Sequence, residues 1–496
     1  MSDHRHITAS GAPEGFDASL ILGELAHAGV VVHVARDDKR MAAMAEALTF
    51  FAPHVPVLQF PGWDCLPFDR VSPNPDISAA RMATLAGLVH GAPKSFVLLT
   101  TLNAATQKVP ARDVLREASF TAIVGDRVDE AGLRDFLVRM GFVQAPTVTE
   151  PGDYAIRGGI IDIFPPGEGG PVRLDFFGDV LDGARRFDPA TQRTTETLSI
   201  VELAPVSEVL LDEAAITRFR QNYRLEFGAA GTDDPLYEAV SAGRKHAGAE
   251  HWLPFFHDKL ETLFDYLPDT TCIMLLDGAA AACGEFQAET TERYESRRHD
   301  RERPLLPPGM LFLDEAGMQK RLVRHALVRI GKFSTSEPSG EQIRYNAYPL
   351  VDVKIRARSE QPAAAINGFL DSYAGRVLLT AESTGRRETL FDQLRGLGIR
   401  PVVLDGWSDF IESDSPLCLT VAPLEQGMRL DSPALAIITE TNLFGDHARQ
   451  SRRRKPARDP SALISNLTDL DIGAPVVHEN HGVGRYRGLE TLTVHH

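Results

Sequence analysis

The first hundred residues of the chain alternate between two kinds of apolar segment. The runs VVVHVA at 30–35 and SFVLLTT at 95–101 are short and continuous, which is typical of strands buried on both faces. The segments KRMAAMAEALTFF at 39–51 and ISAARMATLAGLVH at 77–90 instead place apolar residues at helical spacing. Strands separated by helices predict a parallel sheet with helices on both faces, and hence an α/β domain.

The pattern changes near residue 119. Between 154 and 203, apolar and polar positions alternate in the short runs YAIRGGIIDIF, VRLDFF, VLDGARRF and TTETLSIVEL, which glycine- and proline-rich turns separate. The pair Gly178-Asp179 between two of these runs predicts a two-residue hairpin. We therefore expect a small antiparallel module inserted into the α/β domain, which resumes after residue 205 and includes a buried strand at 271–277.

A second α/β unit is predicted beyond a polar, turn-rich linker. It contains a strand at 376–382, a helix that ends at Gly398, and strands at 400–405 and 434–440. The last stretch, IGAPVVHENHGVGRYRGLETLTVHH, indicates the first strands of a small β domain. Because such a domain needs about three or more strands to be stable by itself, we expect the chain to end inside it.

The predicted fold class is therefore α/β: a parallel α/β domain with an inserted antiparallel β module, a second small α/β domain, and the beginning of a β domain. The predicted segments, in order, are the first part of the α/β domain (1–118), the inserted module (119–204), the second part of the α/β domain (205–334), the linker (335–346), the small α/β domain (347–445), a basic linker with a short helix (446–470) and the start of the β domain (471–496).

Composition narrows the classes of partner. The 496 residues include 52 basic and 68 acidic side chains, a net charge of −16. A field of that sign repels nucleic acid, so we expect protein partners. No apolar run reaches the length that spans a membrane, and the N-terminus lacks a secretory signal. Four scattered cysteines fit a reducing cytoplasm. The one basic run, at 446–459, is either a solvated linker or a segment that binds phosphate or a partner.

The sequence lacks the common catalytic motifs. A phosphate-binding loop of the form GxxxxGK[ST] does not occur, and GAPEGFDASL stands where the first α/β domain would carry it. Residues 311–315, LFLDE, imitate a magnesium-binding strand end, but without that loop they favour a helix cap. His478 and His481 are three residues apart and favour a turn over a zinc site. We predict no catalytic residue, metal or cofactor for this chain.

The run VRLDFF at 172–177 offers the most informative surface. Alternation along a strand directs its first, third and fifth residues toward the core, which leaves Phe177 on the polar face beside Arg173. Arg157 is expected on the preceding strand within pairing reach. An aromatic side chain flanked by arginines has the composition of a protein-binding hot spot. In the alternative interpretation, a neighbouring loop covers Phe177 and both arginines are ordinary surface charges.

Three long motifs occur in a fixed order: FPGWDCLPFDRVSPNPDISAARMATL, then the block from YAIRGGIIDIF to TTETL, then IGAPVVHENHGVGRYRGLETL. Together they resemble bacterial transcription-repair-coupling factors, from about residue 18 to the end of the chain. The excision-repair protein UvrB shares the first two blocks more loosely and lacks the third. UvrB itself is disfavoured, because no aromatic-rich DNA-clamping insertion follows Pro67.

The resemblance implies a UvrB-like, helicase-like α/β domain that has lost its ATP loop, and an insertion that binds UvrA, the damage-recognition ATPase. The UvrA contacts of the family map onto Arg157, Arg173 and Phe177, the same side chains that strand alternation selects. The third motif resembles the start of a Tudor-like domain that contacts the RNA polymerase β subunit, where Leu492 is a candidate contact.

By the same resemblance, ATP and magnesium belong to a DNA translocase motor that this chain lacks, and DNA contacts belong to that motor. We therefore expect an adaptor that recruits UvrA to stalled polymerase without hydrolysing nucleotide, with polymerase binding weak or absent. Two alternatives remain at this point. One is a UvrB-like ATPase with unusual loops; the other is a passive autoinhibitory scaffold.

Overall fold

A computed structural model shows the fold. It describes most of the chain, in these ranges: 6–10, 17–167, 170–228, 234–300, 304–331, 341–344, 347–356, 358–431, 434–445, 475–478 and 482–485. The chain divides into two compact units, residues 1–447 and residues 448–496.

The first unit is built on a seven-stranded sheet whose neighbouring strands all run parallel. From edge to edge it contains β17 (Glu341–Arg344), β1 (His6–Ser10), β16 (Ala326–Gly331), β15 (Cys272–Leu276), β2 (Val30–Ala35), β4 (Phe96–Thr101) and β3 (Val57–Phe60). The strands predicted at 30–35, 95–101 and 271–277 are confirmed. Because β2 and β15 are neighbours, segments on both sides of the insertion share one sheet.

Three strands of this sheet were not predicted: the six-residue β16 and two shorter ones, β1 and β17. β1 has only five residues, and β17 lies inside the segment 335–346, which we predicted to be a linker. Both strands are stabilised by pairing: β1 pairs in parallel with β16 on one side and with β17 on the other. Short polar segments at a sheet edge carry little apolar pattern, so their backbone hydrogen bonds decide the structure.

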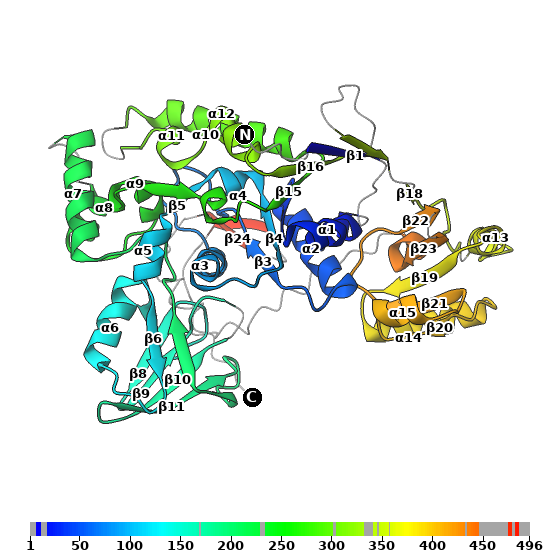
Figure 1. Cartoon of the computed structure of the whole chain (residues 1–496), viewed down its shortest axis with the longest axis horizontal. Coiled ribbons are helices and arrows are strands. Elements are labelled where there is room, and N and C mark those ends of the chain that lie inside the picture. Colours follow the sequence, from blue (N-terminus) through cyan, green and yellow to red (C-terminus); the bar gives the residue numbers. More distant parts are fainter. Residues whose placement is uncertain are drawn as a thin grey trace. The chain divides into compact units, whose positions relative to one another are not determined.

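Helices cover both faces of this sheet, as Figure 1 shows. Val31 and Val97 point to the face covered by α1 and α2, while Val32 and Leu98 point to the opposite face. This two-sided burial explains why the strands are continuous apolar runs. The helices are α1 (Asp17–Ala28), α2 (Asp38–Phe51), α3 (Pro75–His90), α4 (Leu102–Thr106), α5 (Arg112–Glu117), α10 (Ala279–Arg297), α11 (Pro308–Leu311) and α12 (Glu315–Leu322).

A helical subdomain with an aromatic core is attached to the same unit. Phe219 stacks on Phe256 with ring centroids 4.8 Å apart, and Tyr223 and Trp252 are buried in the same cluster. Its elements are α7 (Glu213–Phe227), α8 (Pro235–Ser241), the 3-10 helices η2 (Ala249–Trp252) and η3 (Leu263–Tyr266), α9 (Leu253–Phe256), and a small sheet of β5 (Lys108–Pro110) and β14 (Leu260–Thr262).

The inserted module is a mostly antiparallel six-stranded sheet. Leu133 and Leu137 of α6 (Glu130–Arg139) share a buried cluster with Ile161 and Leu174 of the sheet. From edge to edge the strands are β12 (Thr194–Leu198), β11 (Val180–Phe187), β10 (Val172–Phe177), β9 (Ile160–Ile163), β8 (Asp153–Arg157) and β7 (Val143–Gln144). A separate antiparallel pair, β6 (Phe120–Ile123) and β13 (Ile200–Leu203), joins the entry of the module to its exit.

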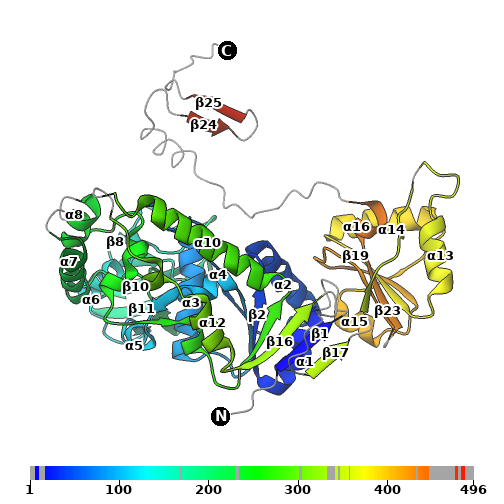
Figure 2. The same cartoon turned by 90° about the horizontal axis from the view of Figure 1, so that it is seen from above.

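The predicted second α/β unit is present within the first compact unit. Its sheet contains, in order, β18 (Ala347–Pro349), β22 (Met428–Asp431), β23 (Ala434–Thr439), β19 (Arg376–Ala381), β21 (Leu417–Val421) and β20 (Val402–Val403). The accompanying helices are α13 (Ala364–Ser372), α14 (Thr384–Gly396), α15 (Trp407–Glu412) and α16 (Glu440–Phe444), drawn in Figure 2. Gly398 adopts a φ of 81° just beyond α14, which confirms the predicted helix end.

The second α/β unit packs on the first through aromatic side chains. Trp407 of α15 meets Phe51 of α2 edge-on, with ring centroids 4.8 Å apart. Leu378 and Ile437 belong to the same buried cluster as Val31. The two α/β units therefore share one apolar core, although the sequence separates them by a polar segment.

In the second compact unit, β24 (Pro475–His478) and β25 (Gly482–Arg485) form an antiparallel pair, which confirms the first strands expected there. The short helix expected within 446–470, the basic run 446–459 and Leu492 lie outside the described residues.

A buried ion pair connects the chain before and after the insertion. Arg81 of α3 donates from Nε to Glu208 Oε1 over 2.7 Å and from Nη1 to the carbonyl oxygen of Pro61 over 2.7 Å. Its guanidinium lies 4.1 Å from the ring centroid of Phe60. Both charged side chains are almost fully buried, and burial raises the pKa of Glu208.

We expect Arg81→Met to lower the free energy of unfolding by about 3–5 kcal/mol, because it leaves the Glu208 carboxyl buried without its partner. Urea unfolding followed by circular dichroism measures this. Arg81→Met combined with Glu208→Leu removes both charges, and should be less destabilised than the sum of the two single variants. Additive effects would show that the pair is not coupled.

A buried histidine gives the subdomain a defined pH dependence. Burial lowers the pKa of His251 to about 4, and its ring meets that of Trp63 edge-on at 5.4 Å. Since the unfolded chain binds a proton at this residue near pH 6.5 and the folded chain does not, stability falls as the pH decreases from 6.5 to about 4.

The contribution of His251 to that fall is up to about 1.4 kcal/mol per pH unit. His251→Gln cannot titrate, so its free energy of unfolding should depend less steeply on pH across this interval. Urea titrations at several pH values compare the two proteins. Parallel pH profiles would contradict the assignment.

Candidate protein-binding surface

Phe177 stands at the tip of a two-residue hairpin. Phe177 pairs with Val180 across the turn, and Gly178 adopts a φ of 66° there. The ring is 82% exposed, whereas Leu174 on the opposite face of the same strand is fully buried. The predicted orientation of Phe177 is confirmed, and the alternative in which a loop covers the ring is wrong.

The register shifts just before this tip, where Asp175 pairs with Gly183 and Phe176 with Leu181, so the extra residue of the bulge is Asp182 of β11. The alternation of β10 is therefore uninterrupted. Phe176 packs against the core of the module, and Phe177 points to the outer face.

The position of Arg157 differs from the prediction. The run YAIRGGIIDIF forms two strands, β8 and β9, joined at Gly158-Gly159, and β9 lies between β8 and β10. Arg157 therefore lies on a strand that does not pair with β10, because β9 separates the two strands. Its side chain is half-exposed, and its Nη2 donates to the carbonyl oxygen of Pro146 over 2.6 Å.

A glycine contact places the turn after Arg157 against the strand that carries Phe177. The backbone N–H of Phe176 donates to the carbonyl oxygen of Gly159 over 2.7 Å. A Cβ atom at Gly159 would lie 2.8 Å from the carbonyl oxygen of Phe176, so this approach requires glycine. Arg157 and Phe177 thus share one end of the sheet although their strands do not pair.

Arg173 is fixed by a buried carboxylate. Its Nε and Nη2 donate to the two oxygens of Asp162 over 2.7 and 2.9 Å, and its guanidinium lies 4.9 Å from the ring centroid of Phe187. Hydrogen bonding to Asp162 raises the pKa of Arg173. The Arg157 Nη1 lies 4.0 Å from the same carboxylate. Arg173 is therefore an oriented, mostly buried cation and not an ordinary surface charge.

Sequence analysis missed two residues of this face. Asp162 is only 2% exposed and lies between the two arginines, while Ile160 is 37% exposed beside Arg157. Both alternate with the core residues of IIDI, and this alternation could have identified them. Register confirms the shared face, because Asp162 is opposite Arg173 and Ile160 is opposite Asp175.

The structure also tests the motifs that sequence analysis set aside. Asp314 caps α12, accepting from the N–H of Gly317 over 2.7 Å, so the helix-cap interpretation of residues 311–315 is confirmed. Within the described ranges, no three histidine, cysteine or acidic side chains are grouped to hold a metal. In that same part of the chain, no helix has both the length and the apolar character to cross a bilayer.

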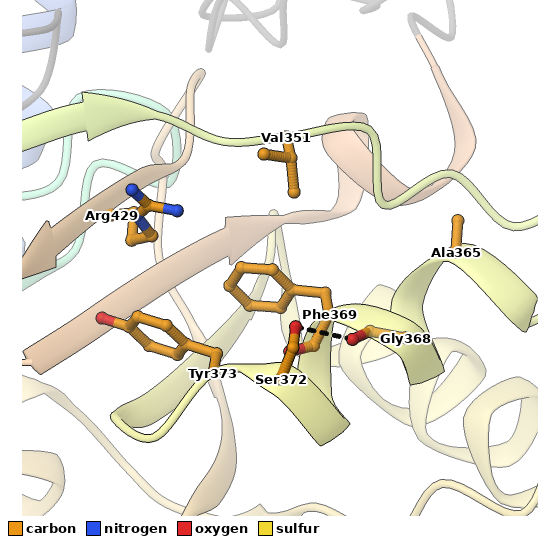
Figure 3. Close-up of a pocket in the computed structure, with 7 residues that line it drawn as sticks. All are labelled: Val351, Ala365, Gly368, Phe369, Ser372, Tyr373 and Arg429. Atoms are coloured by element: carbon orange, nitrogen blue, oxygen red, sulfur yellow. Dashed lines mark hydrogen bonds between the residues drawn. The ribbon is translucent and has the colours of Figure 1, made fainter.

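A hollow of about 310 Å³ lies in the second α/β unit, lined by residues of α13 and by Arg429 of β22 (Figure 3). Phe369 and Tyr373 stack with centroids 5.1 Å apart, and the Tyr373 hydroxyl donates to the carbonyl oxygen of Leu430. Arg429 lies over the ring of Tyr348, and Ser372 Oγ donates to the carbonyl oxygen of Gly368. The two hydroxyls already have partners and Arg429 forms an ion pair with Asp431 at 3.5 Å, so the hollow is less suited to ligand chemistry than the outer face of the module.

Three family models match this chain. The UvrB interaction domain matches residues 121–208, which contain the whole outer face described above. The MFD, D3 domain matches residues 369–443, and the CarD-like/TRCF RID domain matches residues 470–496.

Curated relatives match over most of the chain. A transcription-repair-coupling factor of Haemophilus influenzae is 35% identical over 439 residues, 88% of this chain and 38% of the relative. That of Escherichia coli is 34% identical over 488 residues, 97% of this chain and 42% of the relative. The chain thus spans about two fifths of the length of these relatives. The three domain models and these relatives agree in naming the transcription-repair-coupling factor family over most of the chain.

Proposed function

We propose that this chain is an adaptor that docks UvrA through the outer face of its inserted module. The observation that carries the proposal is the 82% exposed ring of Phe177, held at a hairpin tip within the segment that matches a UvrB interaction domain. A large exposed aromatic ring on a rigid support loses little conformational entropy on binding, so it is an effective anchor.

The two arginines have different roles in this proposal. Arg157 is half-exposed and near the hairpin, so its guanidinium can form charge-assisted hydrogen bonds to a carboxylate of the partner. Arg173 already donates two hydrogen bonds to Asp162 and is mostly buried. It acts mainly by positioning Asp162, whose carboxylate lies between the two arginines.

The role of the whole protein extends the proposal. We infer that the chain links UvrA to stalled RNA polymerase in the cytoplasm, and that residues 470–496 contribute to contact with the polymerase β subunit. Leu492 remains the candidate contact there. ATP-driven translocation on DNA would belong to the rest of the protein, since the phosphate-loop motif is missing from this sequence.

Two other functions would give different results. A UvrB-like ATPase would show saturable nucleotide binding or turnover by the purified chain. A passive scaffold would bind neither UvrA nor polymerase. The exposed Phe177 favours the adaptor, because a scaffold has no need for an uncovered aromatic ring at a hairpin tip.

We expect Phe177→Ala and Arg157→Ala each to weaken UvrA binding by about 1–3 kcal/mol, because each removes an anchor of the interface. Titration of the 496-residue chain against purified UvrA, by calorimetry or surface plasmon resonance, measures this. Leu225→Ala is a matched control, since Leu225 is an 83% exposed apolar side chain on α7 outside the module. Wild-type affinity in the double variant Arg157→Ala/Phe177→Ala would refute the adaptor function.

Arg173→Ala should affect stability as well as binding. Loss of its guanidinium leaves Asp162 buried without its main partner, so we expect the free energy of unfolding to fall by about 2–3 kcal/mol. Phe177→Ala should change it by less than about 0.5 kcal/mol, because that ring is exposed. Adding Asp162→Asn to Arg173→Ala should restore part of the stability, as measured by urea unfolding. Equal stability of Arg173→Ala and the wild type would contradict the positioning role.

A further inference from the structure

A cavity of about 240 Å³ lies at the carboxyl ends of the strands of the main sheet. The loops that follow β2, β3 and β4 line it, together with α10. Parallel α/β sheets bind their ligands outside the carboxyl ends of the strands, so the position is that of a binding site. Its polar lining includes Asp37, Asp38, Asp64, Asn103, Gln107 and Glu289.

The charge of this cavity is strongly negative. Four carboxylates line it, and Arg36, the one basic side chain among the lining residues, pairs with Asp37 over 3.1 Å, which leaves three carboxylates without a basic partner among the lining residues. Burial raises the pKa of Asp38, and the neighbouring charges of Asp37 and Asp64 raise it further. Like charges without full compensation favour a bound cation and repel phosphate. The cavity therefore fits a cationic ligand and not a nucleotide.

Two amide side chains in the cavity have unused hydrogen-bonding capacity. Gln107 is only 2% exposed, and its Nε2 has no hydrogen-bond partner among the described residues. The buried Oδ1 of Asn103 likewise has no partner there. A buried polar atom without a partner costs about 1–3 kcal/mol. Asn103 Oδ1 is an acceptor and suits a ligand rich in donors, whereas Gln107 Nε2 is a donor, so Gln107 accepts from such a ligand only with its amide rotated to bring Oε1 to the cavity.

Aromatic rings complete the cavity. Trp63, Phe286 and Phe312 line it, and the rings of Phe286 and Phe312 meet edge-on at 5.4 Å. Aromatic faces attract organic cations. In the described part of the chain, the acidic side chains are not grouped tightly enough to hold a metal ion. The negative charge is thus spread over several lining side chains, which suits a delocalised cation.

We propose that this cavity binds the guanidinium group of an arginine presented by a partner polypeptide. A planar group with five donors matches the carboxylates, the two amides and the aromatic rings together. The volume is below the range of about 300–1,000 Å³ typical of small-molecule sites, so one side chain fits better than a cofactor. Leu66 lines the cavity and is 47% exposed, which offers an apolar contact to the residue next to the arginine.

This proposal is independent of the UvrA-binding function, because the cavity lies in the α/β domain and its lining residues belong neither to the inserted module nor to its outer face. The residues that line the cavity also lie outside GAPEGFDASL, the segment that stands where a phosphate-binding loop would be. Failure of either proposal would leave the other intact.

The test titrates the 496-residue chain with the capped peptide acetyl-Gly-Arg-Gly-amide, using tryptophan fluorescence and saturation-transfer NMR. The control peptide contains citrulline, which has the shape of arginine without its charge. We expect the citrulline peptide to bind at least about tenfold more weakly, because it loses its charge-assisted hydrogen bonds. Equal binding of the two peptides, or no binding of the arginine peptide, would overturn the proposal.

Two variants locate the site. Glu289→Gln should raise the dissociation constant about three- to tenfold, since it removes a lining carboxylate from an exposed position. Glu292→Gln, on the same helix but outside the cavity, should leave it unchanged. An unchanged dissociation constant in Glu289→Gln, or equal effects in both variants, would overturn the assignment to this cavity.

Gln107→Met separates binding from folding. It removes a buried amide whose Nε2 has no partner among the described residues, so the melting temperature should stay the same or rise while peptide affinity falls. A merely structural Gln107 would instead leave affinity unchanged, which would count against the proposal. Agmatine, a guanidine outside any polypeptide, distinguishes the sources of the cation. If agmatine binds more weakly than the arginine peptide, the result supports a polypeptide partner. If agmatine binds more tightly, the proposal of a polypeptide partner is overturned.

Discussion

The contact between Arg81 and Glu208 is the constraint on which the arrangement of the first unit depends. A domain that an insertion divides must hold its two segments together at the point of division. Arg81 does this from α3, because it reaches Pro61 and Phe60 before the insertion and Glu208 directly after it. With both charges buried, neither can leave without exposing the other to an apolar interior. The exit of the module is thereby fixed relative to the main sheet.

The module uses a similar device on a smaller scale. Asp162 is buried under the outer face and holds Arg173 by two hydrogen bonds, while Arg157 lies at the margin of the same carboxylate. Phe177 needs no such support, since the alternation of β10 up to the hairpin turn determines its direction. The outer face therefore combines one ring placed by the backbone, one cation held by a buried anion, and a second cation, Arg157, held by the carbonyl oxygen of Pro146. A surface organised in this way is ready for a partner before the partner arrives.

The patterns that predicted this fold correctly are those that burial enforces. The strands at 30–35, 95–101 and 271–277 and the exposure of Phe177 all follow from which residues must avoid water. Prediction failed where backbone hydrogen-bond pairing decides which segment forms a strand. β17 was expected to be linker because its stability comes from β1. Arg157 was placed one strand too close because Gly158-Gly159 permits a turn within an apolar run. The cavity residues come from loops far apart in sequence, and local patterns do not bring them together.

The cavity at the main sheet arises from the same topology as a nucleotide-binding site. Its lining is negatively charged, whereas a site for phosphate is positively charged. The carboxyl ends of parallel strands bring several loops to one edge, whichever ligand they bind. Here those loops contribute Asp38, Asp64 and Asn103, where phosphate binding would require backbone N–H groups and a lysine. Burial of the Asp38 carboxylate among like charges costs free energy, which a solvent-exposed position would have avoided. A cation that enters the cavity lowers this cost, so the electrostatics alone favour recognition of a basic side chain over an empty or anion-filled site.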